Sequence, residues 1–239
     1  MKKQGKCGKI VLSITAVKSC IKRGETTMTQ EFVNLRSRKN PKARIKLMSG
    51  HFATMNSHVN TYIDMSTVKT RHNNARETAA ALAEEYKGIM VETIVCLKNT
   101  EVIGAFMAEH LADAGRISMS AGNNISVVTP EFDTMGQMLF RDSNQRMIQG
   151  KQVLILTDSV TTGALLGKAV EAVLYYGGRV CGICAVFSAV NRAAGMDIHS
   201  IFTVSDLPDY KGYAAKDCPL CKEGQKLDGI VNTFGLVKF

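Results

Sequence analysis

The sequence predicts an α/β fold in which a parallel sheet is flanked by helices. Between residues 68 and 204, apolar stretches of strand length alternate with segments of helical periodicity, a pattern typical of parallel sheets covered by helices. Residues 153–156 form a continuous apolar run, as expected for a central strand that is buried on both faces. At 239 residues the chain is long enough to bury the core of one such domain.

The other elements follow from periodicity and from turn residues. Ala75, Ala79 and Leu82 recur at three- and four-residue steps, which predicts a helix over residues 68–86. The remaining predicted elements, in chain order, are a basic loop at 33–50, a polar segment at 54–60, a strand at 91–97, a turn at 98–101, a helix at 101–114, a strand at 125–129, a mobile loop or edge hairpin at 131–150, a helix at 164–176, and strands at 179–189 and 201–204.

Charge and composition exclude several classes of function. Residues 1–27 carry +6 of the formal net charge of +9, so the remaining +3 does not make the folded body a basic nucleic-acid-binding surface. No run of about 18 apolar residues is present, and we therefore expect no membrane partner. The seven cysteines have scattered spacings that do not form a disulfide framework, which favours a reducing cytoplasm.

The basic head, residues 1–27, admits three interpretations. We favour a disordered extension or a segment upstream of a true start at Met28, because the composition becomes ordinary there. A secretory signal is the second interpretation, since a lysine-rich start precedes the apolar residues 10–17. A basic arm for nucleic acid is the third.

A phosphate-binding motif follows the central strand. The strand leads into Asp158, then into the turn Thr161-Thr162-Gly163, and a helix begins near Ala164. Ligands bind at the carboxyl ends of such strands, and hydroxyl groups, a glycine and a helix N-terminus suit an anion there. The carboxylate of Asp158 can accept hydrogen bonds from two ribose hydroxyls. These features predict a ribose 5-phosphate site, and the alternative is an ordinary strand–helix turn with a capping residue.

The motif resembles the phosphoribosyl pyrophosphate motif of type I phosphoribosyltransferases, in which two acids precede Thr-Thr-Gly. It matches at Asp158 and at residues 161–163. It departs at Thr157, where the first acid is usual, and at Ala164 and Leu165, where a small residue and a hydroxyl are usual. The missing acid weakens the expected grip on ribose, so Thr157→Asp is expected to strengthen the site if this position limits it.

Two further stretches indicate one branch of that family. Residues 49–64 resemble the Ser-Gly, Ser and Tyr-Ile-Asp stretch near the start of orotate phosphoribosyltransferases, and residues 217–222 resemble the end of some bacterial members. The resemblance covers about residues 28–225. It implies the type I phosphoribosyltransferase fold with a small hood, divided into a hood region at 28–65, a core at 66–215 and a tail at 216–239. The hood is expected to consist of residues 28–65 either alone or together with the tail.

The resemblance also implies a reaction and a set of site residues. Phosphoribosyl pyrophosphate carries Mg²⁺ and loses pyrophosphate as a nucleobase nitrogen attacks its anomeric carbon; the enzyme is expected to be a homodimer. Lys98 lies in the turn after a strand, where it is either a pyrophosphate contact or a solvated lysine. The expected substrate-binding residues are Lys98, Asp158, Ser159, Val160, Thr161, Thr162, Gly163, Ala164 and Leu165.

Catalytic cations are harder to assign. In orotate phosphoribosyltransferases a mobile loop before the phosphate-binding strand carries Lys and His, whereas residues 131–150 contain neither. Their cations are Arg141 and Arg146, which we predict, with Asp158, as catalytic residues. Arginine can clamp pyrophosphate through two hydrogen bonds but cannot act as a general acid. The alternative is that both arginines are surface charges.

Two functions of different classes therefore remain open. The first is an orotate-phosphoribosyltransferase-like enzyme of pyrimidine biosynthesis, which Asp158 and Thr-Thr-Gly favour. The second is a non-catalytic regulatory protein of the same fold that binds phosphoribosyl pyrophosphate or a nucleotide. Thr157 and the lysine-free loop favour this second function.

Cys218 and Cys221 have the spacing of half a structural zinc site. No second exposed cysteine pair has suitable spacing, so we expect a local structural knuckle, with zinc or a redox dithiol as alternatives. His51 and His58 flank a polar loop, where they either meet a base or phosphate or cap turns.

Overall fold

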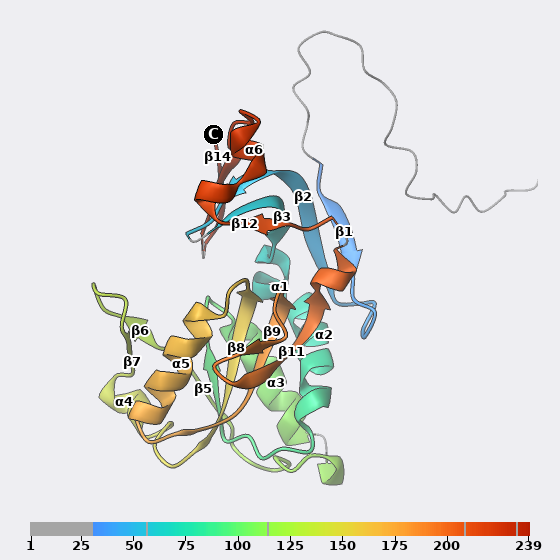
Figure 1. Cartoon of the computed structure of the whole chain (residues 1–239). Helices are drawn as coiled ribbons and strands as arrows, with labels where there is room; N and C mark the ends of the chain where they lie inside the picture. The colour runs from blue at the N-terminus through green and yellow to red at the C-terminus, as the bar shows by residue number, and fades with distance from the viewer. Residues whose placement is uncertain (1–30, 56, 114, 208, 233) are drawn as a thin grey trace, which may run out of the picture.

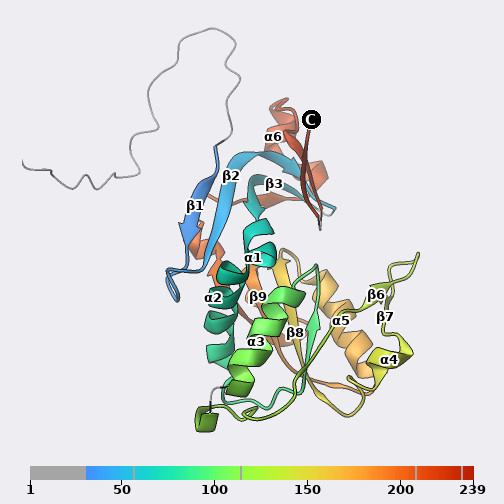
Figure 2. The same cartoon turned by 180° about the vertical axis from the view of Figure 1, so that it is seen from behind.

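The computed structural model describes residues 31–239 except positions 56, 114, 208 and 233 (Figure 1). The basic head at 1–27 and Met28 lie outside the described residues, and their interpretations stay predictions. Two sheets dominate the structure. A central sheet is packed between helices, and a second sheet, which we call the hood sheet, lies beyond the carboxyl ends of the central strands (Figures 1 and 2).

The central sheet has six strands, and their order is β10 (Arg192–Ala193), β11 (Met196–Thr203), β9 (Arg179–Ser188), β8 (Gln152–Val160), β4 (Thr93–Cys96) and β5 (Ser126–Val128). All neighbours from β11 to β5 pair in parallel, and only the short edge strand β10 is antiparallel to β11. The parallel sheet flanked by helices confirms the predicted fold class.

Helices cover both faces of this sheet (Figure 2). The first face carries α1 (Ser66–Thr70), α2 (His72–Ala83), η1 (Glu84–Tyr86) and α3 (Glu101–Asp113), and the second carries α5 (Ala164–Tyr175). Side chains of β8 alternate between the two: Leu154 and Leu156 join the core on the first face, whereas Val153 and Ile155 join the core under α5. The continuous apolar run arises because both faces of β8 are covered.

Several element boundaries differ from the predictions. The helix predicted at 68–86 is divided at Arg71, whose extended backbone (φ −101°, ψ 112°) separates α1 from α2. Strand β8 continues to Val160, so Asp158 lies within the strand and not after it. Residues 131–150 form an edge hairpin of β6 (Glu131–Phe132) and β7 (Met138–Leu139), followed by the short helix α4 (Asp142–Gln145). A short 3₁₀ helix, η2 (Gly115–Ile117), follows α3.

The loop predicted at 33–50 is wrong. The structure has two strands there, because Ile45 and Leu47 alternate with Arg44 and Lys46 and pack against the core. The hood sheet combines these strands, β1 (Val33–Arg36) and β2 (Arg44–Ala53), with β3 (His58–Asp64), with β12 (Gly212–Tyr213) from the end of the core region and with the two tail strands β13 (Gly229–Asn232) and β14 (Gly235–Lys238). Short helices connect them: η3 (Val204–Asp206), η4 (Ala215–Asp217) and α6 (Pro219–Lys222). The tail therefore joins the hood.

None of the helices in the described part of the chain is both long and apolar enough to cross a bilayer.

Candidate functional site

The candidate site lies where the connections of the central sheet reverse direction. Strands β4 and β8 are neighbours, but the chain leaves β4 toward β5 and leaves β8 toward β9, on the opposite side. In such sheets ligands bind in the crevice outside the carboxyl ends of the two strands at this switch point. The turn after β4 meets the end of β8 there, because Lys98 Nζ donates to the Ser159 carbonyl oxygen at 2.8 Å.

Asp158 is the central acid of this edge. Its side chain is 7% exposed, and one carboxylate oxygen accepts from Lys69 Nζ at 2.6 Å. The other oxygen accepts from Ser159 Oγ at 2.9 Å and lies 3.5 Å from Lys98 Nζ. A buried carboxylate needs such partners, since an unpaired buried charge is costly. Two ammonium groups therefore converge on the acid that the motif predicts as the ribose contact.

Lys69 is a site residue that sequence reasoning missed. It lies in α1, is 12% exposed and also donates to the Lys98 carbonyl oxygen at 3.1 Å. A helix of five residues has too little periodicity to indicate which of its side chains faces the sheet. The break at Arg71 separates α1 from α2, and Lys69 reaches the carboxyl ends of β4 and β8 from α1.

The turn after β4 has an unusual backbone. Lys98 and Asn99 have φ values of 54° and 60°, so two successive non-glycine residues adopt the left-handed conformation. Each such residue costs about 1–3 kcal/mol, and this strain is typical of ligand sites. Thr100 stabilises the turn by donating from Oγ1 to the Leu97 carbonyl oxygen at 2.9 Å. The strain supports Lys98 as a site residue more than as an ordinary solvated lysine.

The turn after β8 presents polar groups toward solvent. Thr161 and Thr162 are exposed, and Gly163 caps α5 with a φ of 81°. A Cβ atom on Gly163 would lie 2.8 Å from the Cβ of Ala193, so glycine is required both by the backbone and by space. Ala164 begins α5, and its first turn directs N–H groups at the same place.

Two of the predicted contacts face the protein interior. Val160 is 3% exposed and packs in the core under α5, together with the half-buried Leu165. Neither apolar side chain offers a hydrogen bond to phosphate, so only their backbone groups could contact a ligand.

Thr157, which stands where the first acid of the motif is usual, is buried. It is 1% exposed, and its Oγ1 finds no hydrogen-bond partner among the described residues. Because successive strand residues point to opposite faces, Thr157 faces α5 while Asp158 faces α1. The two positions therefore do not place their side chains side by side.

The structure does not bring Arg141 and Arg146 to Asp158. The Arg141 guanidinium is 74% exposed and pairs with Glu131 across the edge hairpin. Arg146 is followed by Met147, whose carbonyl oxygen accepts a hydrogen bond from Thr93 at the amino end of β4. This end is about 20 Å from Asp158, the length of six strand residues. Sequence order alone did not indicate that residues 141–151 return to the amino edge, and a catalytic role for Arg141 and Arg146 stays a prediction.

Tyr62 connects the hood sheet to this site. Its ring packs against Phe52 in the hood core, with 6.0 Å between the ring centroids. Burial, followed by the negative charge of Asp64 and then of Asp158, raises the pKa of Tyr62 to about 12. The phenol therefore remains a hydrogen-bond donor at neutral pH.

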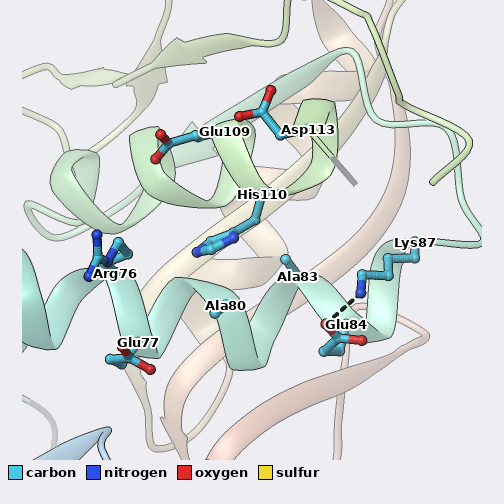
Figure 3. Close-up of a pocket in the computed structure, with 9 residues that line it drawn as sticks. All are labelled: Arg76, Glu77, Ala80, Ala83, Glu84, Lys87, Glu109, His110 and Asp113. Carbon is cyan, nitrogen blue, oxygen red and sulfur yellow. Dashed lines mark hydrogen bonds and ion pairs between the residues drawn. The ribbon is translucent and has the colours of Figure 1, made fainter. Parts of the chain in front are cut away.

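A separate pocket of about 490 Å³ lies on the outer side of α2 and α3 (Figure 3). Its lining is mainly charged, with Arg76 and Glu77 at one end and Lys87 paired to Glu84 at the other. None of the groups of the strand–turn–helix motif lines it, so this pocket is not the candidate site.

Cys218 and Cys221, the weak zinc candidates, lie in the hood. Cys218 precedes α6 and is buried, and Cys221 lies in α6 and is exposed. The structure brings His51 of β2 and His58 of β3 to both thiols. The expectation that the cysteine pair lacks further ligands is wrong, because the second pair consists of histidines that are more than 160 residues distant in the chain.

The fold and the site together define an α/β protein with an acid, two lysines and a Thr-Thr-Gly turn at the switch point of its sheet. No family model matches the chain, but proteins with similar sequences are known. It is 29% identical over 197 residues to a protein of Wolinella succinogenes named orotate phosphoribosyltransferase, covering 75% of this chain and 88% of that protein. It is 25% identical over 177 residues to the protein of that name from Caldanaerobacter subterraneus subsp. tengcongensis, covering 73% and 85%.

Solved structures of similar proteins have related names. The chain is similar to the Mycobacterium tuberculosis H37Rv orotate phosphoribosyltransferase, with 21% identity and a TM-score of 0.47, covering 68% of this chain and 92% of that one. It is also similar to a phosphoribosyltransferase from Corynebacterium diphtheriae, with 21% identity and a TM-score of 0.46, covering 66% and 91%. The sequence relatives confirm the resemblance to orotate phosphoribosyltransferases that residues 49–64 and 158–163 predicted.

Proposed function

We propose that this protein transfers a phosphoribosyl group from phosphoribosyl pyrophosphate to a nucleobase of the orotate type and releases pyrophosphate. The observation that carries the proposal is the carboxylate of Asp158 at the switch point, with two lysine ammonium groups on one side and the Thr-Thr-Gly turn on the other. The names of the sequence relatives support it independently.

The turn after β8 would hold the 5′-phosphate. The hydroxyls of Thr161 and Thr162, together with the N-terminal N–H groups of α5, offer donors around one exposed position. Asp158 would accept hydrogen bonds from the ribose hydroxyls once the lysines release its oxygens. In the free protein the two lysines keep the Asp158 carboxylate paired, and the ribose hydroxyls of the substrate would take their place.

Lys69 and Lys98 would then stabilise the leaving pyrophosphate. The reaction passes through an oxocarbenium-like transition state in which negative charge grows on the pyrophosphate, so fixed cations nearby lower the barrier. Removing one preorganised group of this kind typically costs about 10²–10³ in kcat. The strained backbone at Lys98 and Asn99 would hold the turn in place before the substrate arrives.

Mg²⁺ would enter with the substrate. The ion prefers oxygen ligands and is commonly bound by one or two carboxylates together with substrate phosphates. The Asp158 carboxylate and the Ser159 hydroxyl beside it fit that chemistry. The ion would supply further neutralisation of the pyrophosphate charge, while Asp158 would hold and orient the ribose.

A regulatory protein that binds phosphoribosyl pyrophosphate without turnover is the second candidate. Arg141 and Arg146 lie away from Asp158, and residues 131–150 contain no Lys or His. Thr157 adds no polar contact at the switch point because it is buried under the opposite face. Binding would then depend on the phosphate turn and Asp158 alone.

Pyrophosphate release with a panel of nucleobases, together with calorimetric binding of magnesium phosphoribosyl pyrophosphate, separates the two functions. Turnover with orotate above the other bases supports the enzyme, and tight binding without turnover supports the regulator. Absence of binding contradicts both. Asp158→Asn should weaken binding by about 10- to 100-fold, the value of hydrogen bonds to a charged group. Asp142→Asn, at an exposed position in α4, is the matched control and should bind normally.

The cellular setting belongs to the same proposal. An enzyme of this kind would serve pyrimidine biosynthesis in the cytoplasm and, as the family resemblance implies, would act as a homodimer on small-molecule substrates. Size-exclusion chromatography with light scattering tests the dimer directly.

A further inference from the structure

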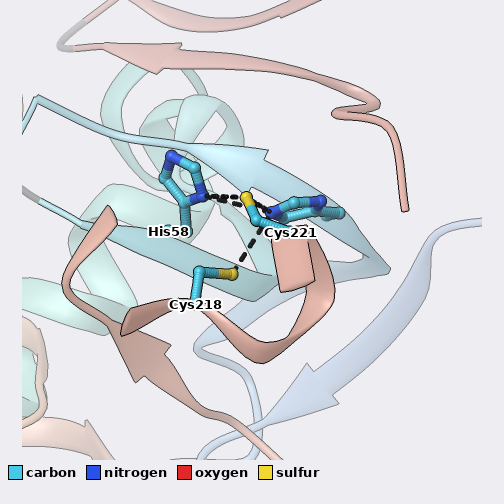
Figure 4. Close-up of side chains that lie close together, drawn as sticks. His58, Cys218 and Cys221 are labelled. Atoms are coloured by element: carbon cyan, nitrogen blue, oxygen red, sulfur yellow. Dashed lines mark hydrogen bonds between the residues drawn. The ribbon is translucent and has the colours of Figure 1, made fainter. Parts of the chain in front are cut away.

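Four side chains with soft or borderline donor atoms converge in the hood, away from the Asp158 site. His51 of β2, His58 of β3, Cys218 before α6 and Cys221 within α6 place one donor atom each within 4.8 Å of all the others. Figure 4 shows His58 of β3 pointing toward Cys221 of α6, with Cys218 beside them. We propose that these four residues bind a single structural Zn²⁺ ion that fastens the tail of the chain to the β2–β3 hairpin.

The distances between the donor atoms are those of a tetrahedral zinc site. Zn–S bonds of about 2.3 Å and Zn–N bonds of about 2.0–2.1 Å place S and N about 3.5 Å apart and two N atoms about 3.3 Å apart. In the structure His51 Nε2 lies 3.5 Å from Cys218 Sγ and 3.6 Å from Cys221 Sγ, and His58 Nδ1 lies 3.3 Å from Cys221 Sγ. The two ring nitrogens are 3.2 Å apart.

The orientation of His51 is fixed by a contact outside the cluster. Its Nδ1 is 3.0 Å from the Gln225 carbonyl oxygen, so Nδ1 carries the proton and Nε2 presents its lone pair to the cluster. Histidine ligands of metals commonly donate their other ring N–H in this way, and the partner sets both the tautomer and the ring plane. The hydrogen bond from His51 Nδ1 to the Gln225 carbonyl oxygen is therefore an observation independent of the four convergent atoms.

Local backbone features bring the ligands together. The register of β2 and β3 shifts between Ser49 and Phe52, and a bulge of this kind redirects a side chain. As a result, the adjacent residues His51 and Phe52 are both buried, whereas a regular strand would expose one of them. The Asp228 carboxylate accepts from the His51 N–H at 2.7 Å and ties the tail to the bulge.

The chemistry of the set selects the ion and its role. Thiolate and imidazole ligands in a tetrahedral arrangement suit Zn²⁺, whereas Mg²⁺ and Ca²⁺ require oxygen ligands. All four positions come from protein, which is the pattern of a structural site and not of a catalytic one. Two thiolates balance the charge of the ion, so the site would add no net charge beside a polyanionic substrate. Its function would be to hold α6 and the following strands in the hood sheet.

Metal content of the full chain, purified without chelator, tests the proposal. We expect one zinc ion per chain, and Co²⁺ substitution should give tetrahedral d–d bands with a thiolate-to-cobalt charge-transfer band. Cys221→Ser and His58→Asn should lose the metal, while Cys181→Ser and the exposed His72→Asn should keep it. Cys221 is exposed, so its replacement by serine removes little packing.

A second measurement guards against variants that fail to fold. Chelation of zinc from the wild-type chain should lower its Tm and speed hydrogen exchange in β2, β3 and α6 but not in β8 or β9, and added zinc should restore both. Two outcomes overturn the proposal: a wild-type chain that neither contains nor takes up zinc, including one with a Cys218–Cys221 disulfide, and zinc retention by the Cys221→Ser and His58→Asn variants. None of these readouts depends on enzyme activity.

Discussion

Replacement of Thr157 by valine should stabilise the protein. Valine has nearly the same shape as threonine, and Thr157 is 1% exposed with no partner for its hydroxyl among the described residues. Burying an unpaired hydroxyl costs about 1–3 kcal/mol in proteins, so its removal should raise the free energy of unfolding by about 1–2 kcal/mol. For a chain of this size each kcal/mol corresponds to a Tm increase of about 2–4 °C.

The opposite substitution, Thr157→Asp, restores the acid that the motif lacks and should fail. Its carboxylate would be buried under α5, on the face opposite to Asp158 and its lysines. An unpaired buried charge costs about 3–5 kcal/mol, so this variant should unfold at much lower denaturant concentration and gain no affinity for phosphoribosyl pyrophosphate. The structure therefore reverses the expectation that the sequence motif raised.

Urea denaturation followed by circular dichroism measures both variants. Thr93→Val is the matched control: Thr93 is equally buried in a neighbouring strand, but its hydroxyl donates to the Met147 carbonyl oxygen. Its loss should cost about 1–3 kcal/mol. If Thr157→Val destabilises as much as Thr93→Val, or if Thr157→Asp folds normally and binds substrate more tightly, the reasoning from burial is refuted.

Three further predictions concern the site and the core. Lys69→Met should reduce pyrophosphate release by about 10²–10³-fold, whereas Lys87→Met, at a distant ion pair, should not, and equal activities would remove Lys69 from the site. Gly163→Ala should lower the free energy of unfolding by about 1–2 kcal/mol and weaken phosphate binding. Gly167→Ala is the control, because a Cβ atom at this position inside α5 meets open space and should stabilise the protein slightly. Differential scanning calorimetry and phosphate titration measure the two effects. Burial raises the pKa of the Cys96 thiol to about 12. Above pH 9 this thiol therefore ionises in the unfolded chain but stays protonated in the folded protein, which lowers the free energy of unfolding by about 1 kcal/mol by pH 10. A Cys96→Ala variant whose free energy of unfolding falls with pH at the same slope would contradict this.

The sequence predicted the central sheet well because burial on both faces leaves a local signal. The apolar residues 153–156 and the helical repeat of Ala75, Ala79 and Leu82 each reflect which side chains face the core, and the structure buries them. The signal failed at 33–50, where charged residues alternate with apolar ones. There the basic composition concealed a strand periodicity that pairing with β3 and the tail strands satisfies.

The candidate site was predictable only as far as it is continuous in the chain. Asp158 and residues 161–163 lie in one strand–turn–helix unit, so their chemistry could be inferred from order alone. Lys69 reaches Asp158 from 89 positions away, and no local pattern indicates that contact. Proximity in the sequence was misleading for Arg146, which lies nearer in the chain than Lys69 but at the other end of β8.

By itself, the sequence determined the fold class and the position of the Thr-Thr-Gly turn before α5, because periodicity, a glycine and a helix start are properties of neighbouring residues. Only the tertiary structure decided which charged groups meet Asp158, that Thr157 is buried and that two histidines join Cys218 and Cys221. Those contacts depend on the order of strands in the two sheets and on a bulge in β2. Strand order and bulge position arise from packing over the whole chain, and short stretches of sequence do not encode them.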